Sequence, residues 1–401
     1  MRFLVETHSE TFLLRLRRRI AEGSVAAADV AVYFVENEGG SASARRIEID
    51  SMGNLDYWPR GVFAEDFERR ELSRQRRSTD RQRMRVELSV DLFDSSDHVE
   101  DIAELMRLFG RGRRDWVISA VAVACAETYF RQHLPGLSPI YQEMAMKAAT
   151  AQSWTVDERP ALLVTAQTAA ADVADLRQAA LLFVEDAISD RCFVLGLAHA
   201  LDEADVVQAI EDGLLEIRHG GGKSRTFTLA AAELTRFART HRVAALVDSD
   251  RMTPSERPGC EKSADSLRSR GGLVHVLMFR EAENYVPNKV LAAIRPYRES
   301  SKKLVALKEL TCEQRAHFDM KRGFPERRSG EPPVPKAHGT LYDGVSGQTI
   351  DRLRAGFGTD LTERLRREAE QGGLAESHFL CLGEGVVPEL RELLAMLRKI
   401  I

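Results

Sequence analysis

The sequence contains little cysteine and no long hydrophobic run. Its cysteines stand singly, without a C-x-x-C pair or a cluster with histidine, at Cys125, Cys192, Cys260, Cys312 and Cys381. This spacing argues against a disulfide framework and a cysteine-rich zinc site, and it fits a reducing compartment. No apolar run approaches the ~20 residues that a membrane helix needs, and "MRFLVETHSE" lacks the apolar core of a secretory signal. We therefore expect a cytoplasmic protein without a membrane partner.

An excess of positive charge is also lacking. The 57 Lys and Arg residues are outnumbered by 61 Asp and Glu residues, which gives a formal net charge of -4 over 401 residues. A uniformly basic surface for nucleic acid is thereby excluded, although arginines gather locally. Intermixed acids in "RRELSRQRRSTDRQRMR" favour a solvated helix or linker there. The cluster "GRGRRDW" is the better candidate for contact with DNA phosphates, through Arg111, Arg113 and Arg114.

Composition divides the chain into four segments. Residues 1–70 contain a strand, an arginine-rich helix and a hairpin-like unit. Residues 71–180 combine a charged linker with alanine-rich helical stretches such as "DWVISAVAVACAETYFRQHL". Residues 181–325 alternate short apolar runs with helical patterns, and residues 326–401 are mostly helical around a proline-rich loop.

The third segment predicts the fold class. Apolar runs in "ALLFVED", "LLEIRHGGG", "RVAALVDSD" and "GLVHVLMFREAENY" are typical of strands, and helical patterns of 10 to 15 residues separate the first three. Strands that alternate with helices of this length are joined by crossovers and lie parallel. The chain is therefore predicted to be an α/β protein whose parallel sheet is flanked by helices.

The glycine run in "LLEIRHGGGKSRTFTL" raises the question of ATP binding, because Gly220, Gly221 and Gly222 precede Lys223 and a serine. A P-loop follows G-x-x-x-x-G-K-[ST], and its first glycine would fall on Ile217. The next strand ends in "VDSD" rather than in an aspartate followed directly by a glutamate. An ATP-binding protein thus stays as one alternative, while a DNA phosphate is the ligand that we expect at this turn.

Carboxylates follow the predicted strands at what should be one edge of the sheet. Asp248 and Asp250 come two residues apart after "VAALV", so strand alternation predicts that both leave on the same side and share a divalent cation. The carboxyl ends of parallel strands meet at one edge, where Glu185 and Asp186 should also lie. An isolated D-x-D is otherwise usually a turn or a helix cap.

This order of motifs, an acid after the first strand, a glycine exit after the second and D-x-D after the third, resembles the TOPRIM domain. That fold serves topoisomerases, primases and the OLD-family nucleases, and the resemblance covers residues 181–324. In the family the second acid of the first motif lies four residues after the glutamate, whereas Asp190 is five after Glu185 and four after Asp186. The first catalytic acid is therefore Glu185 or Asp186, and its place directly after "LLFV" favours Glu185.

The resemblance implies a site that binds Mg²⁺ or Mn²⁺. Its metal ligands would come from Glu185, Asp186, Asp190, Asp248, Asp250, Glu281 and Glu283. Its catalytic residues would be Glu185, Asp248, Asp250 and Lys321. In such a site Glu185 serves as a ligand or general base, and Lys321 neutralises charge in the transition state, unless it is an ordinary solvated lysine.

The N-terminal segment carries a second resemblance. The strand of "FLVETHSE" ends at His8, like the last strand and switch histidine of ABC-type ATPases, and "GNLDYWPRGVF" resembles the tail of AAA/ABC-like ATPases from defence and repair loci. Residues 1–70 would then be the C-terminal remnant of such a domain. No Walker motif precedes His8, so we expect no ATP hydrolysis by this chain alone, with ATP entering only through an upstream or partner ATPase portion.

Together these features predict an OLD-like TOPRIM endonuclease that cleaves DNA as the effector of an ATPase-linked system such as antiphage defence. The expected partners are DNA, an ATPase polypeptide and a second copy of the chain. The alternatives are a non-catalytic regulatory or scaffolding subunit of an ATPase, and the ATP-binding protein considered above. The chain itself would be either a part of a longer ATPase–nuclease or a separate subunit.

Overall fold

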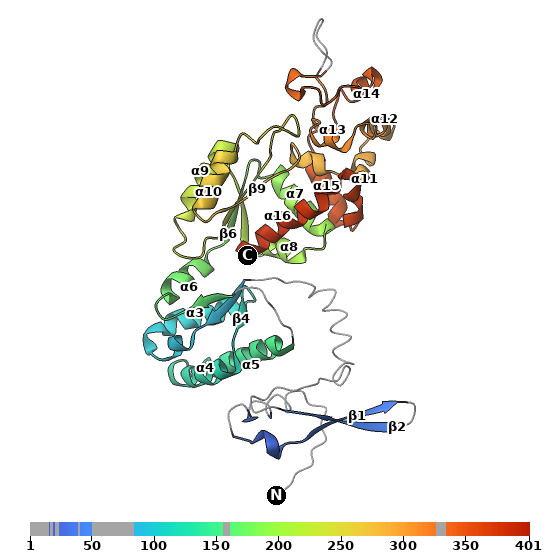
Figure 1. Cartoon of the computed structure of the whole chain (residues 1–401). Helices are drawn as coiled ribbons and strands as arrows, with labels where there is room; N and C mark the ends of the chain where they lie inside the picture. Colours follow the sequence, from blue (N-terminus) through green and yellow to red (C-terminus); the bar gives the residue numbers. More distant parts are fainter. Residues whose placement is uncertain are drawn as a thin grey trace. The chain divides into compact units, whose positions relative to one another are not determined.

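The computed structural model describes residue 16 and residues 19–20, 24–38, 41–49, 84–154, 161–325 and 334–401 (Figure 1). The described residues divide into two compact units, with the main boundary after Gln167. Across the described ranges, no helix is both long and apolar enough to pass through a bilayer.

The described part of unit 1 includes a hairpin. After a 3-10 turn at Ala27–Asp29, strands β1 (Val32–Glu38) and β2 (Ser41–Ile47) pair antiparallel, with Val32 opposite Ile47. Ile47 is buried, whereas Tyr33 and Val35 are exposed. The hairpin-like unit predicted within residues 1–70 is therefore present.

The remainder of unit 1 is a small α/β layer rather than a purely helical region. Three parallel strands lie in the order β4 (Asp115–Val117), β3 (Arg85–Leu88) and β5 (Leu162–Val164). Three helices accompany them, α3 (Val99–Gly110), α4 (Ala120–His133) and α5 (Ser138–Trp154). The sequence predicted only helices and linker for residues 71–180, because strands of three or four residues are too short to show alternation.

Unit 2 contains the predicted parallel sheet. Its order is β7 (Leu215–His219), β6 (Ala180–Val184), β8 (Val243–Val247) and β9 (Leu273–Val276), and every neighbouring pair is parallel. The crossovers contain α7 (Ser189–Ala200), α8 (Ala204–Glu211), α9 (Lys223–Leu234) and α10 (Glu261–Ser269). The α/β class predicted from the alternating pattern is confirmed.

Helices cover both faces of this sheet. Side chains alternate along a strand, so Leu182 and Leu246 pack on the face of α7, α8 and the C-terminal helix α16 (Val386–Ile400). Phe183 and Ala245 pack on the opposite face, against α9 and α10 (Figure 1). Because both faces are covered, every residue of β6 and β8 is buried.

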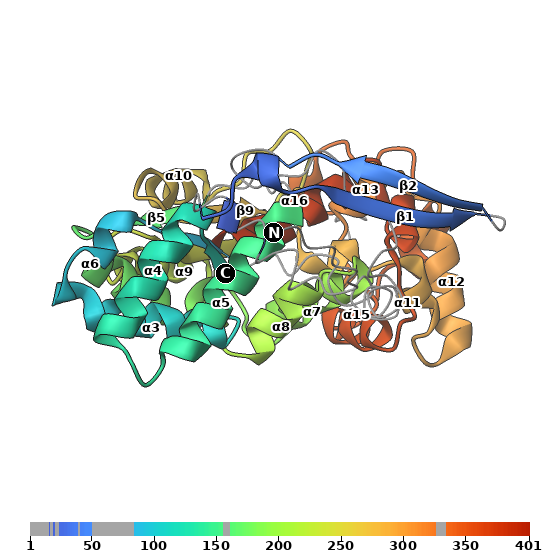
Figure 2. The same ribbon diagram turned by 90° about the horizontal axis from the view of Figure 1, so that it is seen from below.

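The C-terminal residues belong to the same unit as the sheet. Helix α15 (Leu361–Glu370) lies beside α7, with α11 (Asn288–Ala292) and α12 (Tyr297–Leu307) beyond it (Figure 2). The other helices of unit 2 are α6 (Ala169–Arg177), α13 (Cys312–Ala316) and α14 (Gly347–Arg352). The predicted C-terminal helical region, 326–401, is therefore not packed separately in its described part.

Gly196 is the point of closest approach between α7 and α15. A Cβ atom there would lie 3.0 Å from Cγ of Leu365 and 3.1 Å from the backbone nitrogen of Arg366. We expect Gly196→Val to lower the free energy of unfolding by about 1–3 kcal/mol, because two helices would have to separate. Urea unfolding measures this.

The matched control is Gly347→Ala, where a Cβ atom would meet nothing within 4 Å. Its stability should equal that of the native sequence or exceed it slightly. Equal stability of the Gly196→Val protein would contradict the packing of α15 on α7.

Candidate functional site

Acidic side chains gather at the carboxyl edge of the unit 2 sheet. Glu185 and Asp248 each follow a strand directly, and the backbone N–H of Asp248 donates to Oε1 of Glu185 at 3.1 Å. The N–H of Ala282 donates to Oδ1 of Asp248 at 3.0 Å. Three chain segments that the sequence placed at one edge are thus joined through two carboxylates.

Asp186 and Asp190 occupy different environments around the start of α7. The exposed Asp186 accepts from the N–H groups of Ile188 and Ser189, at 2.8 and 3.0 Å, and these bonds lower its pKa. Asp190 is buried, and its Oδ2 accepts from the N–H of Asp186 at 2.9 Å. Asp186 therefore caps a turn, which leaves Glu185 as the acid that contacts Asp248.

A lysine already lies between the two glutamates that follow β9. Nζ of Lys321 is 3.0 Å from Oε2 of Glu281 and 3.2 Å from Oε2 of Glu283. Burial acts to lower the pKa of Lys321, but Glu283 and Glu281 outweigh it and raise that pKa, so the ammonium stays charged. The sequence named Glu281 and Glu283 as candidate metal ligands, and in the structure both contact the ammonium of Lys321.

The structure separates Asp248 from Asp250. Strand β8 ends at Val247, and Asp250 has a φ of +54°, so strand alternation does not extend to it. Its side chain is 62% exposed and forms an ion pair with Lys223. The predicted sharing of one cation by Asp248 and Asp250 therefore lacks its geometric basis, because the two side chains contact different partners.

The acids at the sheet edge repel one another. Burial and then neighbouring carboxylates raise the pKa of Asp248 well above its ordinary value. Burial raises the pKa of Asp190 to about 7, with Glu185 and Glu283 adding to the effect. Burial also raises the pKa values of Glu185 and Glu281, although nearby lysines oppose it. Negative charge at this edge is thus only partly compensated.

In the part of the chain that the structure describes, no three His, Cys, Asp or Glu side chains are arranged so that they could hold a metal ion. The contact between Glu185 and Asp248 offers two carboxylates. Mg²⁺ is commonly bound by one or two carboxylates, with water and substrate phosphate as the other ligands. The donor set therefore fits a cation that is held partly by substrate, and not a closed protein cage.

The glycine run forms a tight turn between β7 and α9. A Cβ atom on Gly220 would lie 1.9 Å from Oγ1 of Thr226, and Gly221 and Gly222 have φ values of +78° and +105°. Backbone geometry alone accounts for the three glycines. Lys223, the first residue of α9, is engaged by Asp250 rather than free above the turn.

The arginines of unit 1 that were predicted to contact DNA differ in exposure. Arg114 is buried in unit 1 and donates through Nη1 to the carbonyl of Arg113 at 2.6 Å, so it is not placed to contact DNA. Trp116 stacks on Phe109 in the core, with ring centroids 5.3 Å apart. Arg111 is exposed and Arg113 partly so. His8 lies outside the described residues.

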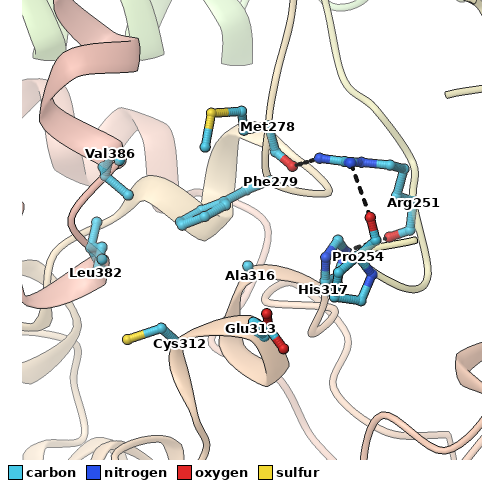
Figure 3. A pocket seen from close by; sticks show the side chains of 12 residues that line it. Arg251, Pro254, Met278, Phe279, Cys312, Glu313, Ala316, His317, Leu382 and Val386 are labelled. Atoms are coloured by element: carbon cyan, nitrogen blue, oxygen red, sulfur yellow. Dashed lines mark hydrogen bonds between the residues drawn. The ribbon is translucent and has the colours of Figure 1, made fainter. Parts of the chain in front are cut away.

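An apolar pocket lies next to the chain segments of the acidic edge (Figure 3). Its volume is about 200 Å³, and Met278, Phe279, Leu382 and Val386 supply apolar walls. Arg251 lies along its rim, where its guanidinium donates to the carbonyls of Met278 and Pro254. The sequence did not predict this pocket, since its walls come from segments about 100 residues apart.

The raised pKa of Asp190 predicts a pH dependence of stability. Between about pH 4 and 7 the folded chain holds a proton that the unfolded chain has lost, so stability falls as pH rises through this range. Asp190→Asn keeps an oxygen for the N–H of Asp186 and removes the titration. We expect it to flatten the slope and to raise the free energy of unfolding at pH 7 by on the order of 2 kcal/mol. Denaturant unfolding from pH 4 to 8 measures both, and an unchanged slope would contradict the assignment.

Comparison with known proteins identifies one family match, and it lies outside this site. A family model described as "Protein of unknown function (DUF3696)" matches residues 25–69. These residues fall within the segment 1–70 that the sequence set apart from the sheet. Neither the curated proteins nor the solved structures gave a match to this chain.

Proposed function

We propose that this chain is a nuclease of the OLD-like TOPRIM type, which hydrolyses phosphodiester bonds of DNA with the help of Mg²⁺ or Mn²⁺. The observation that carries the proposal is the contact between Glu185 and Asp248 at the carboxyl edge of a parallel sheet. This edge is where open α/β sheets bind their ligands. Two adjoining carboxylates there provide the oxygen donors that a hard divalent cation prefers.

Glu185 and Asp248 are the residues that would hold the cation. The Asp248 carboxylate is oriented by the N–H of Ala282, and Glu185 by the N–H of Asp248, so both are positioned without a ligand. A bound divalent ion supplies charge neutralisation on the phosphate and a hydroxide nucleophile near neutral pH. The residues contribute fixed orientation and a negative environment in which a cation is favoured.

The two lysines at this edge would act on phosphate charge. Lys321 is 30% exposed at its side chain while it bridges Glu281 and Glu283, so the side chain is not fully enclosed. Lys223 stands at the start of α9, where helix N–H groups also favour an anion. A DNA phosphate would compete with the exposed Asp250 for Lys223. The proposal uses one cation, because Lys321 already lies between Glu281 and Glu283.

The link to an ATPase belongs to the proposal as well. The family match at residues 25–69 supports a distinct unit within the segment that resembles an ATPase tail. We place the chain in an ATPase-linked system such as antiphage defence, with ATP handled by an upstream or partner portion.

A second candidate function is a non-catalytic regulatory or scaffolding subunit. It is favoured by the ion pairs of Lys223 and Lys321, which engage the carboxylates of Asp250, Glu281 and Glu283. In that case the acidic edge would be a structural network. Binding of ATP at Lys223 has less support, because the glycine turn is explained by its backbone geometry.

The nuclease proposal predicts that Asp248→Asn abolishes cleavage. Nicking of supercoiled plasmid DNA should depend on Mg²⁺ or Mn²⁺ and should fall at least about 100-fold in this variant, since a metal-holding carboxylate is lost. The matched control is Asp265→Asn, an exposed acid of α10 that pairs with Arg268. Its nicking rate should equal that of the native chain.

Two outcomes would redirect the assignment. Undiminished nicking by a folded Asp248→Asn protein would place the activity elsewhere. Absence of both nicking and divalent-cation binding in the native chain, together with co-purification of an ATPase, would favour the regulatory subunit.

A further inference from the structure

A second, polar cavity of about 430 Å³ lies in unit 2. Three arginines and one histidine line it, together with a single carboxylate; these are Arg280, Arg322, Arg354, His338 and Asp319. The volume lies within the range of small-molecule sites, which hold a ligand with a few directed polar groups. None of these residues was among the site residues predicted from the sequence.

The cavity carries positive charge that is partly withdrawn from water. Its lining holds three guanidinium groups and one carboxylate, while Glu281 and Asp351, which do not line it, pair with Arg280 and Arg354. Burial lowers the pKa of His338 and keeps that ring neutral. The side chains of Arg280 and Arg354 are only 13% and 24% exposed. Attraction for an anion is stronger there than at a fully solvated surface.

Some of this positive charge is available to a ligand. Arg280 lies 3.6 Å from Asp319 through Nη2, and Arg354 pairs with Asp351 through Nε at 2.8 Å. The Arg322 side chain is exposed, and within the described ranges its guanidinium has no ion-pair or hydrogen-bond partner. Arginine forks bind phosphate oxygens in pairs, so this group suits a phosphate.

A crossing of two loops holds the cavity in shape. The N–H of Phe324 donates to the carbonyl of Leu353 at 3.0 Å, and the N–H of Phe357 donates to the carbonyl of Met320 at 2.8 Å. Gly323 has a φ of +79°, and a Cβ atom on it would lie 2.1 Å from the Leu353 carbonyl oxygen. Backbone contacts therefore fix Arg322 and Arg354 near each other before any ligand arrives.

His338 indicates what accompanies the phosphate. Its Nδ1 is 2.9 Å from the carbonyl oxygen of Met252, and a carbonyl only accepts, so Nδ1 carries the proton. In a neutral ring Nε2 is then an acceptor. A phosphate diester or dianion offers it no hydrogen, whereas the hydroxyl of a sugar or the amino group of a base does.

We propose that this cavity is a nucleotide-binding site in which Arg322, Arg354 and Arg280 contact a phosphate and His338 accepts from the attached nucleoside. Arg280 also lies 3.3 Å from Glu281, and Arg322 follows Lys321, so the cavity adjoins the acidic edge along two segments. The proposed binding of a nucleotide depends only on the residues of this cavity. Its use as a subsite for a DNA strand rests on the proposed nuclease function.

The test compares three small probes by isothermal titration calorimetry, with a chelator present and no divalent cation. Deoxyadenosine monophosphate should bind more tightly than inorganic phosphate, and deoxyadenosine should not bind. Arg322→Gln and Arg354→Gln should each weaken the monophosphate at least about tenfold, since each removes a charge-assisted hydrogen bond. Arg352→Gln, an exposed neighbour on α14 that does not line the cavity, should leave the affinity unchanged.

The source of the phosphate is distinguished with single-stranded oligonucleotides on the Asp248→Asn protein, again without metal. Tighter binding of a 5′-phosphorylated strand than of a 5′-hydroxyl strand would identify a terminal phosphate. Equal binding of both strands would identify a backbone phosphate. In that case Arg322→Gln should weaken binding and reduce its salt dependence by about one phosphate contact. Either result supports the site.

The proposal is overturned if folded Arg322→Gln and Arg354→Gln proteins bind phosphate, monophosphate and oligonucleotide as the native chain does. Folding is checked by the urea midpoint of each variant. Because no metal is present and Asp248 is replaced, this outcome is independent of nicking. Nucleotide binding without nicking, and nicking without nucleotide binding, can therefore be told apart.

Discussion

Repulsion between carboxylates at the carboxyl edge of the unit 2 sheet is the constraint on which the surrounding structure depends. Strands β6 and β8 end side by side, so Glu185 and Asp248 are brought together whatever their charge. Backbone N–H groups and Lys321 reduce the cost of placing negative charge here. Burial, and then the neighbouring carboxylates, still raise the pKa of Asp248 well above its ordinary value. A fold stabilised only by burial would place apolar residues here. Retained repulsion of this kind is typical of a site that meets a cation or a proton during function.

The residues that follow the sheet in the chain also help to set the charge at its carboxyl edge. The crossing at Gly323 holds the segment that contains Lys321 against residues 353–358. Thr362 of α15 bonds Ser189 at 2.9 Å, and Ser189 in turn lies 3.4 Å from Glu283. The position of the lysine, and thus the charge at the sheet edge, is coupled to the packing of a region that looks separate in the sequence.

The sheet of unit 2 could be predicted because its strands β6 and β8 are buried on both faces and appear as unbroken apolar runs. The approach of Glu185 to Asp248 follows from parallel strands alone. The place of Asp250 does not, because it depends on a left-handed residue after the strand. The short strands β3, β4 and β5 give no periodic signal. The cavity of Arg280, Arg322 and Arg354 depends on loops that no local pattern relates.

Opposite charges alternate along the two segments that the acidic edge shares with the polar cavity. In the first segment, Arg280 lines the cavity and the next residue, Glu281, contacts Lys321. In the second segment, Arg322 lines the cavity and the preceding residue, Lys321, contacts Glu281 and Glu283. Consecutive residues thus belong to two sites of opposite charge, the acidic edge and the cavity lined by arginines. An acidic edge alone would repel a phosphodiester, and a basic cavity alone would bind one without placing it near a cation. Because the acidic edge and the polar cavity lie on the same segments, attraction in the cavity can offset repulsion at the edge. A phosphodiester backbone would then be held where the carboxylates are concentrated.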